Sequence, residues 1–144
     1  MKAVIQRVTQ SSVTIENEKR SISAGLTILI AIASSDTELK AKTLADKILN
    51  LRIFPNEEGK FDKSVIDIKG ELLAVSQFTL YGDCTKGRRP DFTQAASPAN
   101  AKMLYEKFVE YLKQSGLKVV TGEFQAMMQV EIHNDGPVTL IVEN

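Results

Sequence analysis

Hydrophobic and polar residues alternate over the first part of the chain, and this pattern predicts β-strands. The alternation covers residues 2–9 and 12–16, and the polar residues 17–19 offer a turn into a third short strand. Residues 25–33 are almost continuously apolar and rich in β-branched side chains. Because such a run has no polar face, it indicates a strand that is buried on both sides.

Two segments carry apolar residues at the three- and four-residue spacing of a helix. The first follows Asp36, which can cap a helix, and its apolar positions are Ala41, Leu44, Ala45, Ile48 and Leu49. The second begins at Ser97 and Pro98, because proline is best tolerated at the first helical position, and Gly116 ends it. Its apolar stripe consists of Ala101, Leu104, Tyr105, Phe108, Val109 and Leu112.

The other segments divide into apolar runs and irregular stretches. Residues 71–79 form a strongly apolar strand candidate that ends in polar residues, and we expect residues 54–59 to form a loop or turn. Residues 83–96 are the longest irregular stretch. Two more strands are predicted over residues 128–133 and 138–142, with a turn between them.

These elements predict an α/β fold. We expect a single mixed α/β domain over residues 1–144, with layered β-sheets of about seven or eight strands and two main helices packed on one side. A chain of 144 residues suits one domain. Hydrophobic residues make up 43% of it and charged residues 25%, which excludes a disordered or collagen-like chain.

The charge and the cysteine count limit the classes of partner and site. Eighteen Lys and Arg residues balance 18 Asp and Glu residues, so any contact with RNA has to come from a local basic patch. One Cys and one His cannot build a disulfide framework or a four-ligand zinc site. With no secretory signal or membrane-spanning segment in the sequence, we expect a soluble, cytoplasmic protein.

The polar end of strand 71–79 is the first candidate for chemistry. Ser76, Gln77 and Thr79, with Phe78 between them, offer two hydroxyls and an amide beside backbone N–H groups freed from the sheet. Such groups can bind a carbonyl and stabilise an oxyanion. A strand end whose polar groups are satisfied internally is the alternative, and no neighbour supplies the general base that an alcohol nucleophile needs.

The second candidate is a short segment around a Gly-Pro unit: Asn134, Asp135, Gly136, Pro137, Val138 and Thr139. Glycine lets the backbone approach a ligand closely, and proline lacks an N–H, so the unit presents carbonyl oxygens with little side-chain bulk. The alternative is an ordinary turn between two strands. A cis bond before Pro137 is opposed by its general frequency, about 5–6% of X–Pro bonds in folded proteins.

The third candidate is a basic cluster in the irregular stretch, made of Lys86, Arg88 and Arg89. Such a cluster can hold phosphates, although a solvated surface loop would have the same composition. His133 is interpreted as a structural or edge residue, and Cys84 as an inert thiol, because no helix N-terminus or paired cysteine motif adjoins it in the sequence. The chain has no glycine-rich phosphate loop, dinucleotide fingerprint, His-Glu-x-x-His or Gly-x-Ser-x-Gly motif, so we expect no cofactor and no metal.

Taken together, the first two candidates resemble the D-aminoacyl-tRNA deacylases of the D-Tyr-tRNA deacylase type. That family carries a Ser-Gln-x-Thr-Leu motif and an Asn-x-Gly-Pro-Val-Thr motif, which are present here as Ser76–Leu80 and Asn134–Thr139. The resemblance runs the whole length of the chain. It includes Ala3–Val8, Ala45–Ile48, Leu51–Phe54, Lys86–Pro90 and Met128–Val130.

The resemblance implies a homodimer that hydrolyses the ester between a D-amino acid, or glycine, and the 3′ end of tRNA. In such enzymes the Gly-Pro bond is cis, and the motif of one subunit reaches into the pocket of the other. Gly136 and Pro137 would then form a gate that excludes L-amino acids, and Asn134, Val138 and Thr139 would be further substrate-binding residues beside it. Arg7 would hold this segment in its productive orientation.

The resemblance also implies how the reaction proceeds. Ser76, Gln77, Phe78 and Thr79 would line the pocket and place the ester, and the 2′-hydroxyl of the terminal ribose would assist. An older interpretation makes Thr79 the nucleophile, and the sequence leaves both possibilities open.

The partners follow from the same resemblance: the acceptor end of tRNA and a second copy of the chain, with neither membrane nor DNA. Arg88, Arg89 and Lys86 are a weaker hypothesis for tRNA binding. Two other functions stay open, namely a non-catalytic RNA-binding relative and an editing deacylase for L-aminoacyl-tRNA.

Overall fold

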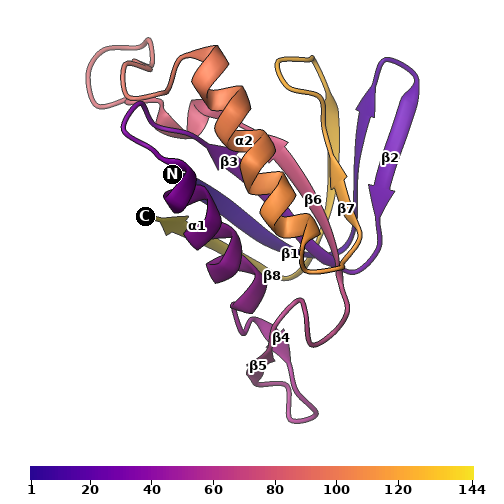
Figure 1. Ribbon diagram of the computed structural model, residues 1–144. Helices are drawn as coiled ribbons and strands as arrows, with labels where there is room; N and C mark the ends of the chain where they lie inside the picture. The colour runs from indigo at the N-terminus through magenta and orange to yellow at the C-terminus, as the bar shows by residue number, and fades with distance from the viewer.

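The computed structural model describes residues 1–144 and is built on one six-stranded mixed sheet (Figure 1). Its strands are β1 (Lys2–Ile15), β2 (Glu18–Ile22), β3 (Gly25–Ala31), β6 (Glu71–Ser76), β7 (Val119–Thr121) and β8 (Gln129–Glu143). The order along the sheet is β2-β1-β3-β6-β7, and β8 also pairs with β1. β3, β6 and β7 run parallel to one another, while β1 runs antiparallel to β2, β3 and β8.

β1 is long enough to belong to two layers of this sheet. Its first half pairs with β3 and its second half with β2. β2, which pairs with the second half of β1, also contacts β6 and β7. Nη1 of Arg20 in β2 donates a hydrogen bond to the carbonyl of Thr121 in β7 at 3.3 Å. The sheet therefore folds over itself around a small core of Val8, Val13, Ile15, Ile22, Leu73 and Val75.

The two helices, α1 (Glu38–Asn50) and α2 (Pro98–Lys113), lie side by side on the opposite face of the sheet (Figure 1). The main core lies between them and the sheet, and it contains every apolar helix position predicted from the sequence. β6 is apolar throughout because both of its faces are buried. Leu72 and Ala74 face the helices, and Leu73 and Val75 face the second layer. The predicted fold, with layered sheets and two helices on one side, is confirmed, and the strands number eight.

The prediction that residues 2–9 and 12–16 are separate strands is wrong, as is the prediction of two strands over residues 128–142. β1 and β8 are each continuous, because they supply each other with hydrogen-bond partners along almost their whole length. The ladder shifts register between Gln6 and Val8 and again between Val8 and Gln10. Such bulges interrupt the alternation of the sequence without ending the strand.

Several element ends differ from the prediction. Thr37, not Asp36, is the N-cap of α1, and its side chain accepts a hydrogen bond from the backbone N–H of Lys40 at 3.4 Å. The buried carboxylate of Asp36 instead accepts one from the α-amino group of Met1 at 2.7 Å. The strand predicted over residues 25–33 ends at Ala31, because the chain leaves the sheet there to reach α1.

Residues 54–59, predicted as a loop, begin a small hairpin that projects from the main body (Figure 1). Its strands are β4 (Phe54–Pro55) and β5 (Phe61–Lys63), which pair antiparallel. Strand β7 was not predicted, since three residues are too few to show a period. Neither helix is long and apolar enough to cross a membrane.

Candidate active site

The chain leaves the sheet directly after Ser76, earlier than the predicted strand end at residue 79. The N–H of Gln77 still donates to the carbonyl of Ile30 at 2.7 Å, and the next residues form the short 3₁₀ helix η1 (Phe78–Tyr81). The bond between the N–H of Gly82 and the carbonyl of Thr79, at 2.9 Å, closes this turn. The polar motif therefore lies at the carboxyl edge of a buried strand, where side chains are free to face a ligand.

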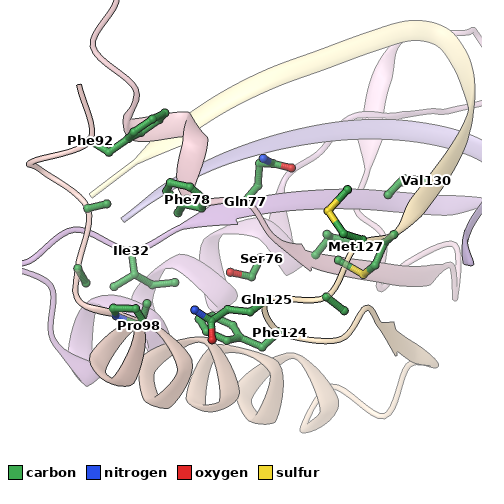
Figure 2. Close-up of a pocket in the computed structure, with 16 residues that line it drawn as sticks. Ile32, Ser76, Gln77, Phe78, Phe92, Pro98, Phe124, Gln125, Met127 and Val130 are labelled. Carbon is green, nitrogen blue, oxygen red and sulfur yellow. The ribbon is translucent and has the colours of Figure 1, made fainter. Parts of the chain in front are cut away.

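A cavity of about 760 Å³ opens at this edge, between β6, η1, the start of α2 and residues 124–130. Its lining is mainly apolar: Ile32, Val75, Ser76, Gln77, Phe78, Phe92, Ala95, Ala96, Pro98, Ala101, Phe124, Gln125, Ala126, Met127, Met128 and Val130. Figure 2 shows Ser76 in the middle, with Phe78 and Phe92 on one side and Met127 and Val130 on the other. The volume of the cavity suits a small organic group that is largely buried when bound.

Two aromatic rings form one wall of this cavity. Phe78 lies edge-on to Phe92, with ring centroids 5.1 Å apart and an interplanar angle of 60°. Phe78 is 54% exposed although it lies in a hydrophobic pocket. An exposed aromatic surface of this kind offers a face on which a flat ring can stack.

The cavity contains no acidic, basic or histidine side chain. Its polar groups are the Ser76 hydroxyl and the amides of Gln77 and Gln125. The Gln77 amide donates to the hydroxyl of Thr79, which is exposed and not part of the lining. Within one chain, the site can therefore position and polarise a carbonyl, but it offers no general base.

Tyr105 of α2 is a buried titratable residue whose ring packs against the cavity residue Phe124, with centroids 6.1 Å apart. Its hydroxyl donates to the carbonyl of Ala74 at 2.9 Å, and burial raises the pKa of this hydroxyl well above its ordinary value. It stays neutral at physiological pH and holds α2 against β6.

The Gly-Pro segment lies elsewhere in the chain, within β8. The prediction of a turn over residues 134–137 is wrong, since Asn134 pairs with Val8 and Thr139 with Gln6 across the ladder with β1. The peptide bond between Gly136 and Pro137 is cis, and both residues are exposed. None of residues 134–139 lines the cavity, so the two sequence motifs do not meet within one chain.

The residues of this segment differ in their contacts and conformation. Val138 packs against the main core, and Oγ1 of Thr139 lies 3.4 Å from Nε2 of Gln6. Gly136 has a φ of +121°, a conformation that only glycine adopts readily. A Cβ at this position would also lie 2.9 Å from a methyl group of Val138.

Arg7 fixes the position of this segment from β1. It takes an inward position of the strand, after Ala3 and Ile5, and is only 7% exposed. Nη1 donates to the carbonyl of Ile53 at 2.7 Å, and Nε lies 3.2 Å from the carbonyl of Asp135 and 3.0 Å from its carboxylate. A buried guanidinium needs such partners, because an unpaired charge would be costly to desolvate.

The basic cluster lies in an exposed loop that is closed by two backbone hydrogen bonds between Asp83 and Asp91, at 2.8 and 2.9 Å. Lys86, Arg88 and Arg89 are exposed and form no ion pair. The loop continues into Phe92 of the cavity wall. Three unpaired cations therefore lie on the segment that leads to the site.

Cys84 and His133 have no part in the cavity. Cys84 is exposed, and His133 lies in a separate polar groove beside Gln10. No cluster of His, Cys, Asp or Glu side chains that could hold a metal ion is present. The sequence did not point to Phe92, Phe124, Gln125 or Met127, which lie in irregular segments without a motif.

Comparisons with known proteins agree over the whole chain. The family model described as D-Tyr-tRNA(Tyr) deacylase matches residues 4–143. A protein named D-aminoacyl-tRNA deacylase from Clostridium botulinum (strain Alaska E43 / Type E3) is 58% identical over 145 residues, covering 100% of this chain and 97% of that protein.

Two solved structures share the fold. One, titled c-Myc DNA Unwinding Element Binding Protein, has a TM-score of 0.93 and 44% identity, and the match covers 100% of this chain and 99% of that one. The other, titled as a probable eukaryotic D-amino acid tRNA deacylase, has a TM-score of 0.87 at 18% identity and covers 98% of this chain and 97% of that one, so it bears on the fold alone. The family match and the relative with 58% identity show that this chain belongs to the D-Tyr-tRNA(Tyr) deacylase family.

Proposed function

We propose that this chain is a D-aminoacyl-tRNA deacylase, which hydrolyses the ester between a D-amino acid and the 3′-terminal ribose of tRNA. Family membership and the names of its relatives support this activity. The observation that carries the proposal furthest is the separation of the two motifs. A pocket with carbonyl-binding groups lies at one place, and an exposed cis Gly-Pro unit without side-chain bulk lies at another.

We propose that a second copy of the chain brings the two together. In a two-fold dimer, each Gly136-Pro137 unit would enter the pocket of the partner, and two equivalent sites would form. β8 is suited to such an interface, because it pairs with β1 on one edge only and carries the exposed Ile141 beyond the Gly-Pro unit. The exposed Met127 at the pocket would lie under the same contact.

Chiral selection would then depend on exclusion. The carbonyl oxygens of Gly136 and its neighbours would form a wall with room for the hydrogen on the α-carbon of a D-amino acid. The side chain of an L-amino acid would collide with that wall, and a steric clash discriminates without any attractive contact to the D-enantiomer. Glycine has no side chain to exclude, so glycyl-tRNA would also be hydrolysed.

The chemistry requires water to attack the ester carbonyl carbon and the bond to the ribose 3′-oxygen to break. Free amino acid and tRNA are the products. Ser76, Gln77 and backbone N–H groups around Phe78 would place the carbonyl and stabilise the oxyanion. Because the pocket lacks an ionisable side chain, we propose that the neighbouring 2′-hydroxyl of the ribose assists proton transfer and that no protein nucleophile is required.

The edge-to-face pair of Phe78 and Phe92 would receive the terminal base, and the unpaired Lys86, Arg88 and Arg89 would contact phosphates nearby. With balanced charge over the rest of the chain, binding would concentrate on the acceptor end. The enzyme would act in the cytoplasm, where aminoacyl-tRNA is used.

The direct test uses one tRNA charged with the D- or the L-form of the same amino acid, without added metal or nucleotide. We expect rapid release of the D-amino acid and little release of the L-form. Release of neither would favour a non-catalytic RNA-binding relative. Release of the L-form alone would favour an editing deacylase, and equal rates would contradict chiral selection.

A further inference from the structure

The β4–β5 hairpin places two aromatic rings beside the side chain of Arg7. Besides the bond from Nη1 to the Ile53 carbonyl, the guanidinium carbon lies 6.0 Å from the ring centroid of Phe54 and 5.7 Å from that of Phe61. Arg7 therefore contacts the hairpin on one side and Asp135 on the other. The hairpin and the Gly-Pro unit are linked through one side chain.

Polar contacts hold the two strands of the hairpin together. Oδ1 of Asn56 accepts hydrogen bonds from the N–H groups of Glu58 and Lys60, both at 3.0 Å. At the base, Nε of Arg52 donates to the carbonyl of Asp62 at 2.6 Å, and the two side chains also form an ion pair. The turn and the base are each fixed by polar contacts that do not depend on the main core.

Phe61 is unusual because it is a large apolar side chain that is 57% exposed. Its neighbour Arg7 is only 7% exposed, whereas the other aromatic contact, Phe54, is 5% exposed and belongs to the main core. Phe61 belongs to neither hydrophobic core. Core packing therefore does not explain its position, and its contact with a buried cation does.

We propose that Phe61 is a positioning residue: it covers the guanidinium of Arg7 and so holds the Gly136-Pro137 segment in place. This inference rests on the proposed function, because the consequence of the position is chiral selection. A more mobile Arg7 would let Asp135 and Gly136 move. The carbonyl oxygens that exclude L-amino acids would then no longer be held in fixed positions.

The test compares Phe61→Ala with two controls. Phe61→Tyr retains the ring face over Arg7. Leu39→Ala removes an apolar side chain that is 72% exposed and lies on α1, outside β1, the hairpin and β8. Each variant is assayed for kcat/KM with D- and L-aminoacyl-tRNA, for its thermal midpoint, and for the ¹H–¹⁵N signal of the Arg7 Nε–H group.

We expect Phe61→Ala to lower the ratio of D to L kcat/KM about three- to tenfold, the effect of losing one cation–π contact. The Arg7 Nε–H signal should shift or broaden in this variant alone. The two controls should retain the wild-type ratio and signal.

The inference is overturned if Phe61→Ala retains both the ratio and the Arg7 signal. A fall in activity with both esters alike, at an unchanged Arg7 signal, would show a merely structural role and overturn it as well. If the wild-type protein releases no D-amino acid, the proposed function fails, and the Arg7 signal alone decides whether Phe61 holds that side chain.

Discussion

Arg7 and Gly136 approach so closely that a Cβ on Gly136 would lie 3.2 Å from Nη2 of Arg7. Arg7 links the Gly-Pro segment to the chain just before β4, because it donates to the carbonyls of both Asp135 and Ile53. The glycine is thus required by its backbone conformation and by its neighbour. Arg7 and the Gly-Pro segment are in direct contact, although 128 positions separate Arg7 from its partner Asp135.

Gly136→Ala is expected to lower kcat/KM for D-aminoacyl-tRNA by about tenfold or more, because the positive φ costs an estimated 1–3 kcal/mol and the methyl group crowds Arg7 and Val138. Gly116→Ala is the matched control, since Gly116 also has a positive φ, +79°, but nothing lies within 4 Å of its Cβ position. It should lose stability without losing activity. If Gly136→Ala were as active as the wild type, the gate assignment would be wrong.

Thr79→Val tests whether a protein hydroxyl attacks the ester. The Thr79 side chain is exposed, does not line the pocket and accepts a hydrogen bond from Gln77. We expect kcat to fall by less than about tenfold, whereas loss of a nucleophile would cost about 10⁴-fold or more.

The complementary experiment removes the 2′-hydroxyl of the substrate. With tRNA ending in 2′-deoxyadenosine, we expect the wild type to slow by about 10²-fold, the typical effect of removing an acid–base group. A reversal of these two results would make Thr79 the nucleophile.

The double variant Arg88→Ala with Arg89→Ala is expected to weaken tRNA binding and to reduce its salt dependence. Each phosphate contact contributes about one unit to the slope of log K against log salt concentration. The control replaces Lys60 and Lys63, which are basic residues on the β4–β5 hairpin. An unchanged affinity and slope in the arginine variant would exclude the loop from binding.

Tyr105→Phe is expected to lower the free energy of unfolding by about 1 kcal/mol at neutral pH, through the lost bond to the Ala74 carbonyl. Burial raises the pKa of Tyr105 in the folded protein above its ordinary value of 10.0. The buried hydroxyl therefore contributes its full stability below that pH, and the contribution is lost as the pH rises above it.

Urea unfolding of the wild type and of Tyr105→Phe, compared near neutral pH and above pH 10, tests whether the stability contributed by the Tyr105 hydroxyl falls as the pH rises. The difference between the two proteins should shrink at the higher pH. A difference that grows with pH would contradict the pKa direction.

The sequence predicted the elements with a strong local pattern. The helical stripes of α1 and α2 are clear because all their buried positions are apolar, and β6 because both its faces are buried. The continuity of β1 and β8 could not be predicted, since it depends on hydrogen bonds between residues far apart in sequence, such as Gln10 and His133. The pattern around Pro137 is typical of a turn, whereas in the structure this segment pairs with β1 as part of β8.

The candidate site shows the same division. Ser76, Gln77 and Phe78 lie in the cavity as their motif indicated, but Thr79 does not line it, and Phe124 and Gln125 come from a segment without any motif. The role of the β4–β5 hairpin was not visible either, because the contact between Phe61 and Arg7 arises only from tertiary structure. A residue whose role depends on a single tertiary contact, as proposed for Phe61, leaves no local signal.

The central claim is that each active site takes its pocket from one chain and its gate from another. Gly136→Ala damages only the gate and Gln77→Ala only the pocket, so mixed dimers carrying one copy of each would have one site with both defects and one intact site. Mixed dimers isolated with two different affinity tags should show about half of the wild-type D-aminoacyl-tRNA deacylase activity per dimer, while each parent variant stays impaired. Activity no higher than the mean of the two parents would contradict a shared site.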